Sequence, residues 1–246
     1  MLRVYPLNAG SVLVDKSVLT AHMNYGEKIE VPSIVWLIEG GPELVVVDTS
    51  FGPPRLMEQW HWPVKRLPEQ EIPRLLENRK ISPSEVGTVI ISHLHWDHCW
   101  NLELFKKSRI IVQRSELEYA RNPLYFHAWA FDSPSTGRRA DWHRVNFTVV
   151  DGDYEVFDGL RLFLTPSHTY GDQSVLLNQK YLITPDLVPL YENWAGNKLI
   201  KHIPPPYYDA KAIADSINRV EELTEHSGVL LLPSHDFKVL RKPYYQ

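Results

Sequence analysis

The chain has 246 residues, 43% of them hydrophobic and 23% charged, with a net charge of −4 at pH 7, which is ordinary for a globular protein with a sizeable core. Acids and bases are interspersed, which excludes the basic face that a nucleic acid requires, and no apolar run approaches the roughly 20 residues that span a bilayer. The single cysteine, Cys99, excludes an internal disulfide, and with no secretory signal in the first residues the prediction is a cytoplasmic protein.

The first half of the chain is predicted to form mainly short strands. Residues 34–38 and 44–47 are apolar and flank a Gly-Gly-Pro turn, a pattern typical of a hairpin. Leucine and isoleucine at helical spacing predict a helix over 69–79, and Ser-Pro-Ser-Glu at 82–85 resembles a short helical start. The apolar run at 87–92 then predicts a buried strand.

Beyond this strand the pattern becomes less regular. Residues 109–113 predict a further strand, and Ser115 is expected to cap a short helix with Glu118 at the capping-box position. Residues 122–145 are rich in aromatic side chains and show no sustained period. An irregular segment of this length in a compact domain is usually functional, so we expect it to form a substrate wall or an oligomer contact.

The second half repeats the order of strands followed by a helix. Four apolar runs predict strands at 147–150, 160–165, 174–177 and 181–184. An apolar stripe predicts a helix over 209–226, capped by Asp209, and a last strand follows over 229–232. Because no linker or low-complexity tract intervenes, we expect one domain over residues 1–246, with two packed halves, sheets inside and helices outside.

A run of six residues at 93–98, His-Leu-His-Trp-Asp-His, follows a predicted strand and offers four side chains that can bind a metal. Four ligands this close in sequence cannot all surround one ion, because neighbouring side chains diverge. Two ions are therefore expected, with His93 and His95 on one and Asp97 and His98 on the other. A structural role is disfavoured because it would bury four polar side chains without a ligand.

Three further predicted strands end in a residue of a ligand type, each after a proline or a small residue: His168, Asp186 and His235. Strand ends in a layered fold converge on one edge, so these residues can meet the run at 93–98. Five His and two Asp would hold two zinc-like ions with three ligands each and one shared carboxylate. Asp48 also follows a strand and is expected to hydrogen-bond a ligand.

The order of these residues resembles the metallo-β-lactamase superfamily: His-x-His-x-Asp-His, then a lone His after Thr-Pro, a lone Asp and a lone His. The likeness runs the length of the chain and includes Val-Val-Val-Asp-Thr at 45–49, similar to the family's hydrophobic-Asp-Thr strand end. Within the superfamily it is closest to the N-acyl homoserine lactone lactonases. The resemblance implies an α+β fold, a four-layer αββα sandwich with a two-metal site at the sheet edges.

The resemblance also implies two ligand sets and a bridge: His93, His95 and His168 for one metal, Asp97, His98 and His235 for the other, and Asp186 between them. The implied cofactors are two Zn²⁺ ions, with Fe, Mn or Co as alternatives, and a hydroxide between the ions is the implied nucleophile. The chain departs from the lactonases at Ser167, which replaces a glycine, and at Asp172, which replaces a histidine. Pro189 stands where the lactonases place a tyrosine that contacts the substrate carbonyl, and Tyr191 lies two residues on. The expected catalytic residues are Asp97, Asp186 and Tyr191.

The leading prediction is a metal-dependent hydrolase that opens a lactone or a similar cyclic ester, with a small molecule as its predicted partner. The lactonase likeness implies quorum quenching. A cyclic amide hydrolase and a glyoxalase II-like thioesterase are the alternatives, and a homodimer is left open. We expect residues 122–145 and 187–194 to select the substrate. The other histidines are expected at the surface or in a pocket: His22, His61, His127, His143, His202 and His226.

Overall fold

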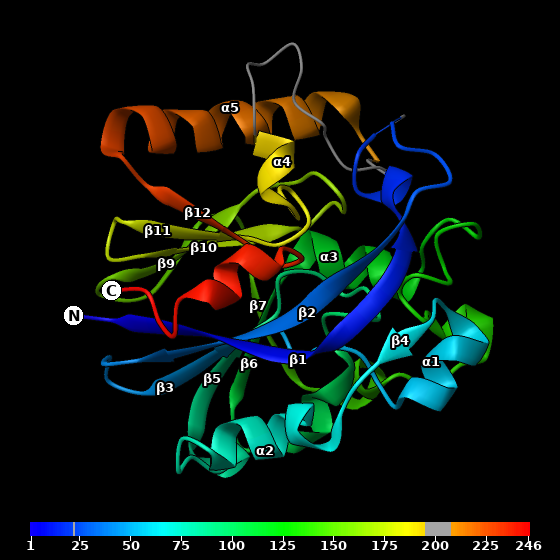
Figure 1. The fold of residues 1–246 in the computed structure, drawn as a ribbon, viewed down its shortest axis with the longest axis horizontal. Helices are drawn as coiled ribbons and strands as arrows, with labels where there is room; N and C mark the ends of the chain where they lie inside the picture. The colour runs from blue at the N-terminus through cyan, green and yellow to red at the C-terminus, as the bar shows by residue number, and fades with distance from the viewer. Residues whose placement is uncertain (22, 195–207) are drawn as a thin grey trace.

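The computed structural model of the protein describes residues 1–21, 23–194 and 208–246. Two β-sheets pack face to face, and helices cover their outer faces (Figure 1). The predicted α+β fold, a four-layer αββα sandwich, is confirmed by this arrangement. None of the helices in the described parts of the chain has the length and apolarity needed to traverse a bilayer.

The larger sheet has seven strands in the order β4-β1-β2-β3-β5-β6-β7. The bounds of these strands are Arg3–Asp15 (β1), Lys28–Glu39 (β2), Leu44–Val47 (β3), Val64–Lys65 (β4), Val86–Ile90 (β5), Arg109–Gln113 (β6) and Phe147–Val150 (β7). The expected hairpin of residues 34–38 and 44–47 is present as the antiparallel pair of β2 and β3. From β3 onward, β5, β6 and β7 pair in parallel, so their carboxyl ends share one edge.

The smaller sheet has five strands in the order β12-β11-β10-β9-β8. The strands span Tyr154–Phe157 (β8), Leu160–Leu164 (β9), Gln173–Leu177 (β10), Tyr181–Thr184 (β11) and Leu230–Pro233 (β12). The helices span Pro54–Trp60 (α1), Ile72–Glu77 (α2), Arg114–Arg121 (α3), Tyr191–Trp194 (α4) and Ala210–Ser227 (α5). In Figure 1, α5 lies along the outer face of the smaller sheet, and α1 and α2 lie beyond the larger one.

Alternation along β2 explains why this strand is buried on both faces. Ile34, Trp36 and Ile38 pack against the smaller sheet, in a cluster that includes strands β9 to β12. Val35 and Leu37 point the other way and join the cluster that contains residues of α1, α2 and α3. Because successive side chains of a strand point to opposite faces, one continuous apolar run supplies two cores.

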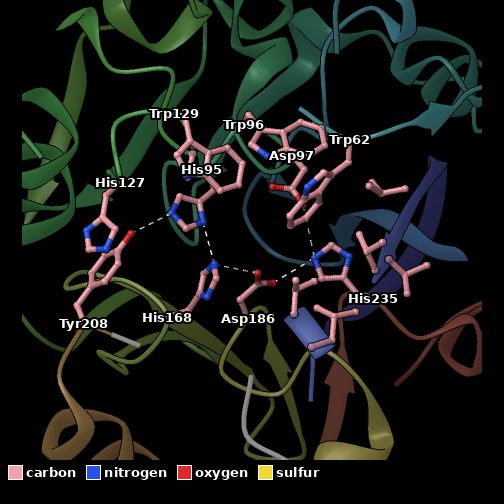
Figure 2. A pocket seen from close by; sticks show the side chains of 16 residues that line it. Trp62, His95, Trp96, Asp97, His127, Trp129, His168, Asp186, Tyr208 and His235 are labelled. Atoms are coloured by element: carbon pink, nitrogen blue, oxygen red, sulfur yellow. Dashed lines mark hydrogen bonds and ion pairs between the residues drawn. The ribbon is translucent and has the colours of Figure 1, made fainter. Parts of the chain in front are cut away.

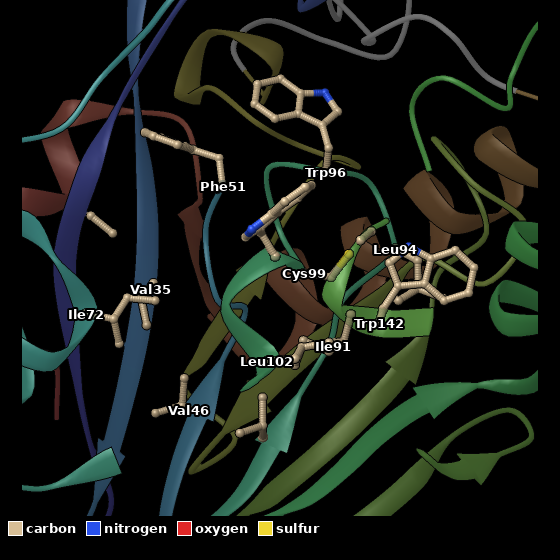
Figure 3. Packing of buried hydrophobic residues seen from close by; sticks show 14 of the residues in the cluster. Val35, Val46, Phe51, Ile72, Ile91, Leu94, Trp96, Cys99, Leu102 and Trp142 are labelled. Carbon is tan, nitrogen blue, oxygen red and sulfur yellow. The ribbon is translucent and has the colours of Figure 1, made fainter. Parts of the chain in front are cut away.

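The run at 93–98 is anchored in the outer cluster by the residues between its ligands. Leu94 and Trp96 are buried among Ile91, Cys99 and other apolar residues (Figure 3). The His and Asp side chains that alternate with them instead lie among the other candidate metal ligands. The alternation of ligand and apolar residue in the sequence thus becomes an alternation of site and core. Cys99 itself is buried and free of any disulfide.

Strands β1, β4 and β8 and helices α1 and α4 were not predicted, and two predicted helices differ in detail. Strand β1 was not predicted, because Pro6 and Gly10 interrupt its pattern; the chain accommodates them with a shift of register between Asn8 and Ser11. The helix expected over 69–79 is a 3-10 turn followed by the shorter α2. Ser115 does not cap α3, since β6 runs directly into that helix and Gln113 is the capping residue.

Candidate metal centre

The ends of five strands bring the candidate ligands to one edge, between the two sheets. In the larger sheet β3 and β5 are parallel neighbours, and Asp48 and His93 follow their carboxyl ends. In the smaller sheet β11 and β12 are parallel neighbours, and Asp186 and His235 follow them in the same way. His168 follows the end of β9. Residues that are far apart in the sequence therefore meet because parallel strands end at a common edge.

Three groups of side chains have their ligand atoms within 4.8 Å of one another, and two of these groups share no residue and could hold one ion each. We call these two the first ligand group (His93, His95 and His168) and the second ligand group (Asp97, His98 and His235). The third group, His93, His98 and Asp186, joins these two. Asp186 lies between them. Its Oδ2 is 3.3 Å from Nε2 of His168, and its Oδ1 is 3.1 Å from Nε2 of His235. One oxygen thus faces each group, as a bridging carboxylate requires.

The ring nitrogens crowd together in a way that suits a divalent cation. His95 Nδ1 lies 2.8 Å from His168 Nε2, and His98 Nε2 lies 3.2 Å from His235 Nε2. Nε2 of His93 is buried and makes no hydrogen bond with any described residue. Burial and the neighbouring histidines hold the pKa values of His93 and His95 well below the usual range, so both rings stay neutral, the form that binds a metal. Five imidazoles and two carboxylates are a donor set that suits zinc and similar ions.

Asp48 orients His98 from behind, as expected from the sequence. Its Oδ2 accepts a hydrogen bond from His98 Nδ1 at 2.8 Å and another from Ser92 Oγ at 2.8 Å. Burial opposes protonation of His98, but Asp48, Asp97 and Asp186 together raise its pKa well above the usual range. A metal cation in the second ligand group would balance this negative charge. A hydrogen bond of this kind fixes which ring nitrogen of a ligating histidine faces the metal.

Glu116, on α3, ties together the two loops that carry the first ligand group. One carboxylate oxygen accepts from the backbone N–H of Leu94 at 2.7 Å; the other accepts from Thr169 Oγ1 at 2.6 Å and from the N–H of Gly171 at 3.1 Å. A side chain at position 171 would meet the Glu116 backbone at 2.4 Å, so the close approach requires glycine. Burial raises the pKa of Glu116 to about 7.

A cavity of about 160 Å³ opens onto the ligands (Figure 2). Asp97, His95, His168, Asp186 and His235 form its polar floor. The other lining residues are mostly apolar or aromatic: Val12, Val14, Val18, Leu19, Val31, Trp62, Trp96, His127, Trp129, Ala130 and Tyr208. An apolar cavity of about 150 Å³ is large enough to bind benzene, so the space suits a small ring with part of a chain.

Trp96 lines the cavity and also packs in the core, and a buried network of charged side chains supports it. The ring of His61 stacks on Trp96 at 4.4 Å, with the two planes 4° apart. His61 Nε2 lies 2.9 Å from Oδ2 of Asp132, and Arg138 donates to Oδ1 of the same carboxylate at 2.8 Å. His61 therefore lies behind the wall of the cavity and does not line it.

The comparison with known proteins decides the family. Residues 30–230 match the Metallo-beta-lactamase superfamily. The chain belongs to this superfamily. It is similar to an N-acyl homoserine lactonase of Bacillus sp, with 25% identity over 245 residues that cover 96% of this chain and 94% of the relative. It is also similar to the N-acyl homoserine lactonase AttM of Azorhizobium caulinodans, with 28% identity over 255 residues that cover 96% and 93%.

Solved structures show the same fold. A variant of Bacillus thuringiensis AiiA with N-decanoyl-L-homoserine at its active site is 25% identical, with a TM-score of 0.80 and coverage of 97% of this chain and 95% of that one. A probable metal-dependent hydrolase from Staphylococcus aureus is 15% identical, with a TM-score of 0.74 and coverage of 100% and 95%, and shows the fold alone. As a member of the metallo-β-lactamase superfamily with such relatives, the chain is a metal-dependent hydrolase that acts on a small molecule.

Within this superfamily fold, the seven residues expected to bind metal all meet at the centre, whereas Tyr191 does not join them. Its hydroxyl donates to the carbonyl oxygen of Leu231 at 3.2 Å, and its ring packs in the cluster between the sheets. No described residue at 187–194 lines the cavity, while His127, Trp129 and Ala130 of the segment 122–145 do. That segment therefore forms a wall of the cavity.

Two residues near the site were not predicted from the sequence. Glu116 is one of two acids on α3, and only its burial separates it from the exposed Glu118. Tyr208 directly precedes Asp209, which caps α5 as predicted. Burial raises the pKa of the Tyr208 hydroxyl well above the usual range. Of the other histidines, His22 and His202 lie outside the described residues.

Proposed function

We propose that this protein is a lactone hydrolase that works with two zinc ions, one in each ligand group. The observation that carries the proposal is the position of Asp186, with one oxygen toward each group, on the floor of a largely apolar cavity. The similar lactonases support the choice of a lactone as the substrate class. Hydrolysis of an N-acyl homoserine lactone would make the protein a quorum-quenching enzyme.

Two divalent ions held here would supply a hydroxide nucleophile near neutral pH and polarise the carbonyl of the ester. The protein's own contribution is to keep His93 and His95 neutral, to align the ligands and to hold them away from bulk water. In the hydrolysis, the bond between the carbonyl carbon and the ring oxygen breaks, and the ring oxygen leaves as an alkoxide that takes up a proton. A new bond forms between the hydroxide oxygen and the carbonyl carbon, and the hydroxyl group added in this way supplies the proton. Asp97 lines the cavity, so we assign it the relay of that proton from the added hydroxyl to the alkoxide.

The character of the cavity wall favours a neutral cyclic ester over a glutathione thioester. Glutathione carries carboxylates, which a binding site would normally meet with lysine or arginine. Among the described residues that line the cavity, none is a lysine or an arginine. Valines of β1 and β2 on one side and tryptophans on the other suit an uncharged ring with an acyl chain.

Metal analysis combined with a substrate panel tests this function. We expect two equivalents of metal in the purified protein and turnover of at least one lactone that stops with a chelator and returns with Zn²⁺. The panel contains N-acyl homoserine lactones, simple lactones and S-lactoylglutathione. If none of the lactones shows metal-dependent turnover, the proposal is wrong. Turnover of the thioester alone would instead support the thioesterase alternative.

A further inference from the structure

The indole of Trp96 packs face to face against the ring of a buried histidine from a distant part of the chain. His61 follows α1, and its ring centroid lies 4.4 Å from that of Trp96 with only 4° between the two planes. The side chain of His61 is fully buried. Because a protein interior is closely packed, a flat ring in this position prevents the indole from tilting toward it. His61 therefore defines one side of the space that Trp96 occupies.

A hydrogen bond to Asp132 fixes the orientation of the His61 ring. Nε2 of His61 lies 2.9 Å from Oδ2 of Asp132, whose side chain is fully buried as well. Arg138 donates to Oδ1 of the same carboxylate at 2.8 Å and to the carbonyl oxygen of Trp60 at 3.1 Å. One cation thus holds both the partner of His61 and the residue that precedes it. Rotation of the imidazole would break a buried hydrogen bond, which is costly.

Asp132 itself is held in an unusual backbone conformation. Its φ is +44°, in the left-handed region that a residue with a side chain rarely adopts. Its carbonyl oxygen accepts a hydrogen bond from Nε2 of His143 at 2.8 Å, and the carbonyl oxygen of Phe131 accepts one from the indole of Trp142 at 2.8 Å. A costly conformation persists only where the surrounding contacts enforce it, and such residues cluster at functional sites. Asp132 is therefore a rigid anchor for His61.

Trp96 connects this support to both ligand groups. In the sequence it lies between His95 of the first ligand group and Asp97 of the second. Its backbone N–H donates to the carbonyl oxygen of Ala130 at 2.9 Å, and both residues line the cavity. A tilt of the indole would therefore move the backbone on either side of it, and with that backbone one ligand of each group.

We propose that His61 is a positioning residue that holds the indole of Trp96 and, through it, one ligand of each metal. The ring face of His61 provides the support, and the hydrogen bond to Asp132 keeps that face parallel to the indole. Glu116 and Asp48, by contrast, each support one ligand group. The inference rests on the proposed function only in that both ligand groups are taken to hold metal, and it does not depend on the identity of the substrate.

Two substitutions separate the ring face from the hydrogen bond. His61→Gln keeps a donor for Asp132 and removes the ring, whereas His61→Phe keeps a ring against Trp96 and leaves an oxygen of Asp132 unpaired. In urea unfolding of the metal-free proteins, His61→Phe should be the less stable variant, because an unpaired buried polar group is costly. In competition with chelators of graded affinity, His61→Gln should instead be the variant that loses metal more readily. We expect both equivalents to weaken by about 2- to 12-fold, the range for a lost contact between aromatic rings.

A spectroscopic measurement follows Trp96 directly and needs no metal. In metal-free protein labelled with 5-fluorotryptophan, the ¹⁹F signal of Trp96 is identified by its loss in Trp96→Phe. This signal should broaden or split in His61→Gln, because the indole gains freedom to tilt, while the signal of Trp36, buried between the sheets, stays unchanged. His226→Gln is the matched control, since this histidine is exposed near the end of α5, and it should alter neither metal retention nor the ¹⁹F spectrum.

The outcomes separate this inference from the proposed function. If metal retention follows the same order as stability in urea, with His61→Phe the weaker in both, His61 has only a structural role and the inference is wrong. Loss of metal from one ligand group alone, or an unchanged Trp96 signal in His61→Gln, would also overturn it. A wild-type protein that binds fewer than two equivalents of metal would contradict the proposed function, whereas a broadened Trp96 signal in His61→Gln would still support the positioning role.

Discussion

Replacing Glu116 with glutamine should release one metal ion more readily than the other. The Glu116 carboxylate accepts hydrogen bonds from Leu94, Thr169 and Gly171, which belong to the loops that carry the first ligand group. None of these bonds reaches the second ligand group, where Asp48 holds His98 instead. The substitution keeps the size and shape of the side chain but replaces one acceptor oxygen with an NH₂ donor.

The magnitude follows from the bonds that glutamine can and cannot make. Its oxygen can still accept from Leu94, and the Thr169 hydroxyl can rotate to accept from the new NH₂. The N–H of Gly171 then faces a donor and stays unpaired in a buried site, which costs about 1–3 kcal/mol. If the loop relaxes when the metal is absent, the whole cost applies to the metal-bound state. The affinity for the metal then falls roughly 5- to 150-fold. Lost support of a ligand typically weakens metal binding by about 10- to 100-fold, in the same range.

Competition with chelators of graded affinity measures this effect. We expect Glu116→Gln to lose one metal equivalent at a chelator strength that leaves both equivalents in wild type, while the other equivalent is retained as before. Glu118→Gln is the matched control, since Glu118 lies on the same helix and is exposed. Equal weakening of both metals, or identical retention in the two variants, would refute the role of Glu116 in supporting the first ligand group.

Three further predictions concern charge and metal around the same centre. Asp48→Asn should weaken retention of the metal in the second ligand group by about 10- to 100-fold in chelator competition, because His98 loses its oriented acceptor. Burial raises the pKa of Glu116 in the folded protein from its ordinary value of 4.5 to about 7. In the metal-free protein, the contribution of this group to folding stability is therefore fully present below pH 4.5 and is lost as the pH rises through 7. Urea unfolding should therefore show metal-free wild type losing about 3 kcal/mol relative to Glu116→Gln between pH 4.5 and pH 8, and a constant difference would contradict this. Removal of metal should lower the melting temperature, and Zn²⁺ should restore it, because an ion that binds only the folded state stabilises it.

The pattern of residues in the sequence was sufficient to predict the layers and most strands, because apolar runs and turn residues determine the local structure of the chain. It failed at β1, where the chain runs as a strand through Pro6 and Gly10. Gly10 adopts a φ of +117°, and an added side chain there would meet the carbonyl oxygen of Lys65 at 2.5 Å. The bend that makes this strand possible depends on contact with β4, which is more than fifty residues away in the sequence. The secondary-structure propensities of neighbouring residues contain no information about a contact this distant in the sequence.

The same distinction applies to the site. The seven candidate ligands were predictable because each follows a strand end, so sequence position implies spatial position. Glu116 and Tyr208 lie on or beside helices, and their contacts with the ligand loops depend on how those helices dock. Tyr191 shows the limit of sequence proximity: it is close to Asp186 in sequence, but its hydroxyl donates to Leu231 and the residue does not line the cavity.

Metal binding and substrate selection therefore rest on different parts of the fold, with one point of contact. The ligands are fixed by strand ends, whereas the cavity walls come from β1, β2 and the segment 122–145. A wall residue such as Val14 or Trp129 has no neighbour in sequence among the ligands, so its substitution can alter substrate range without disturbing the metals. Trp96 is different, because it lies between the ligands His95 and Asp97 and also lines the cavity. A change at Trp96 that alters how the substrate fits must therefore also act on both ligand groups. For this reason the buried residues that support Trp96 are part of the catalytic architecture.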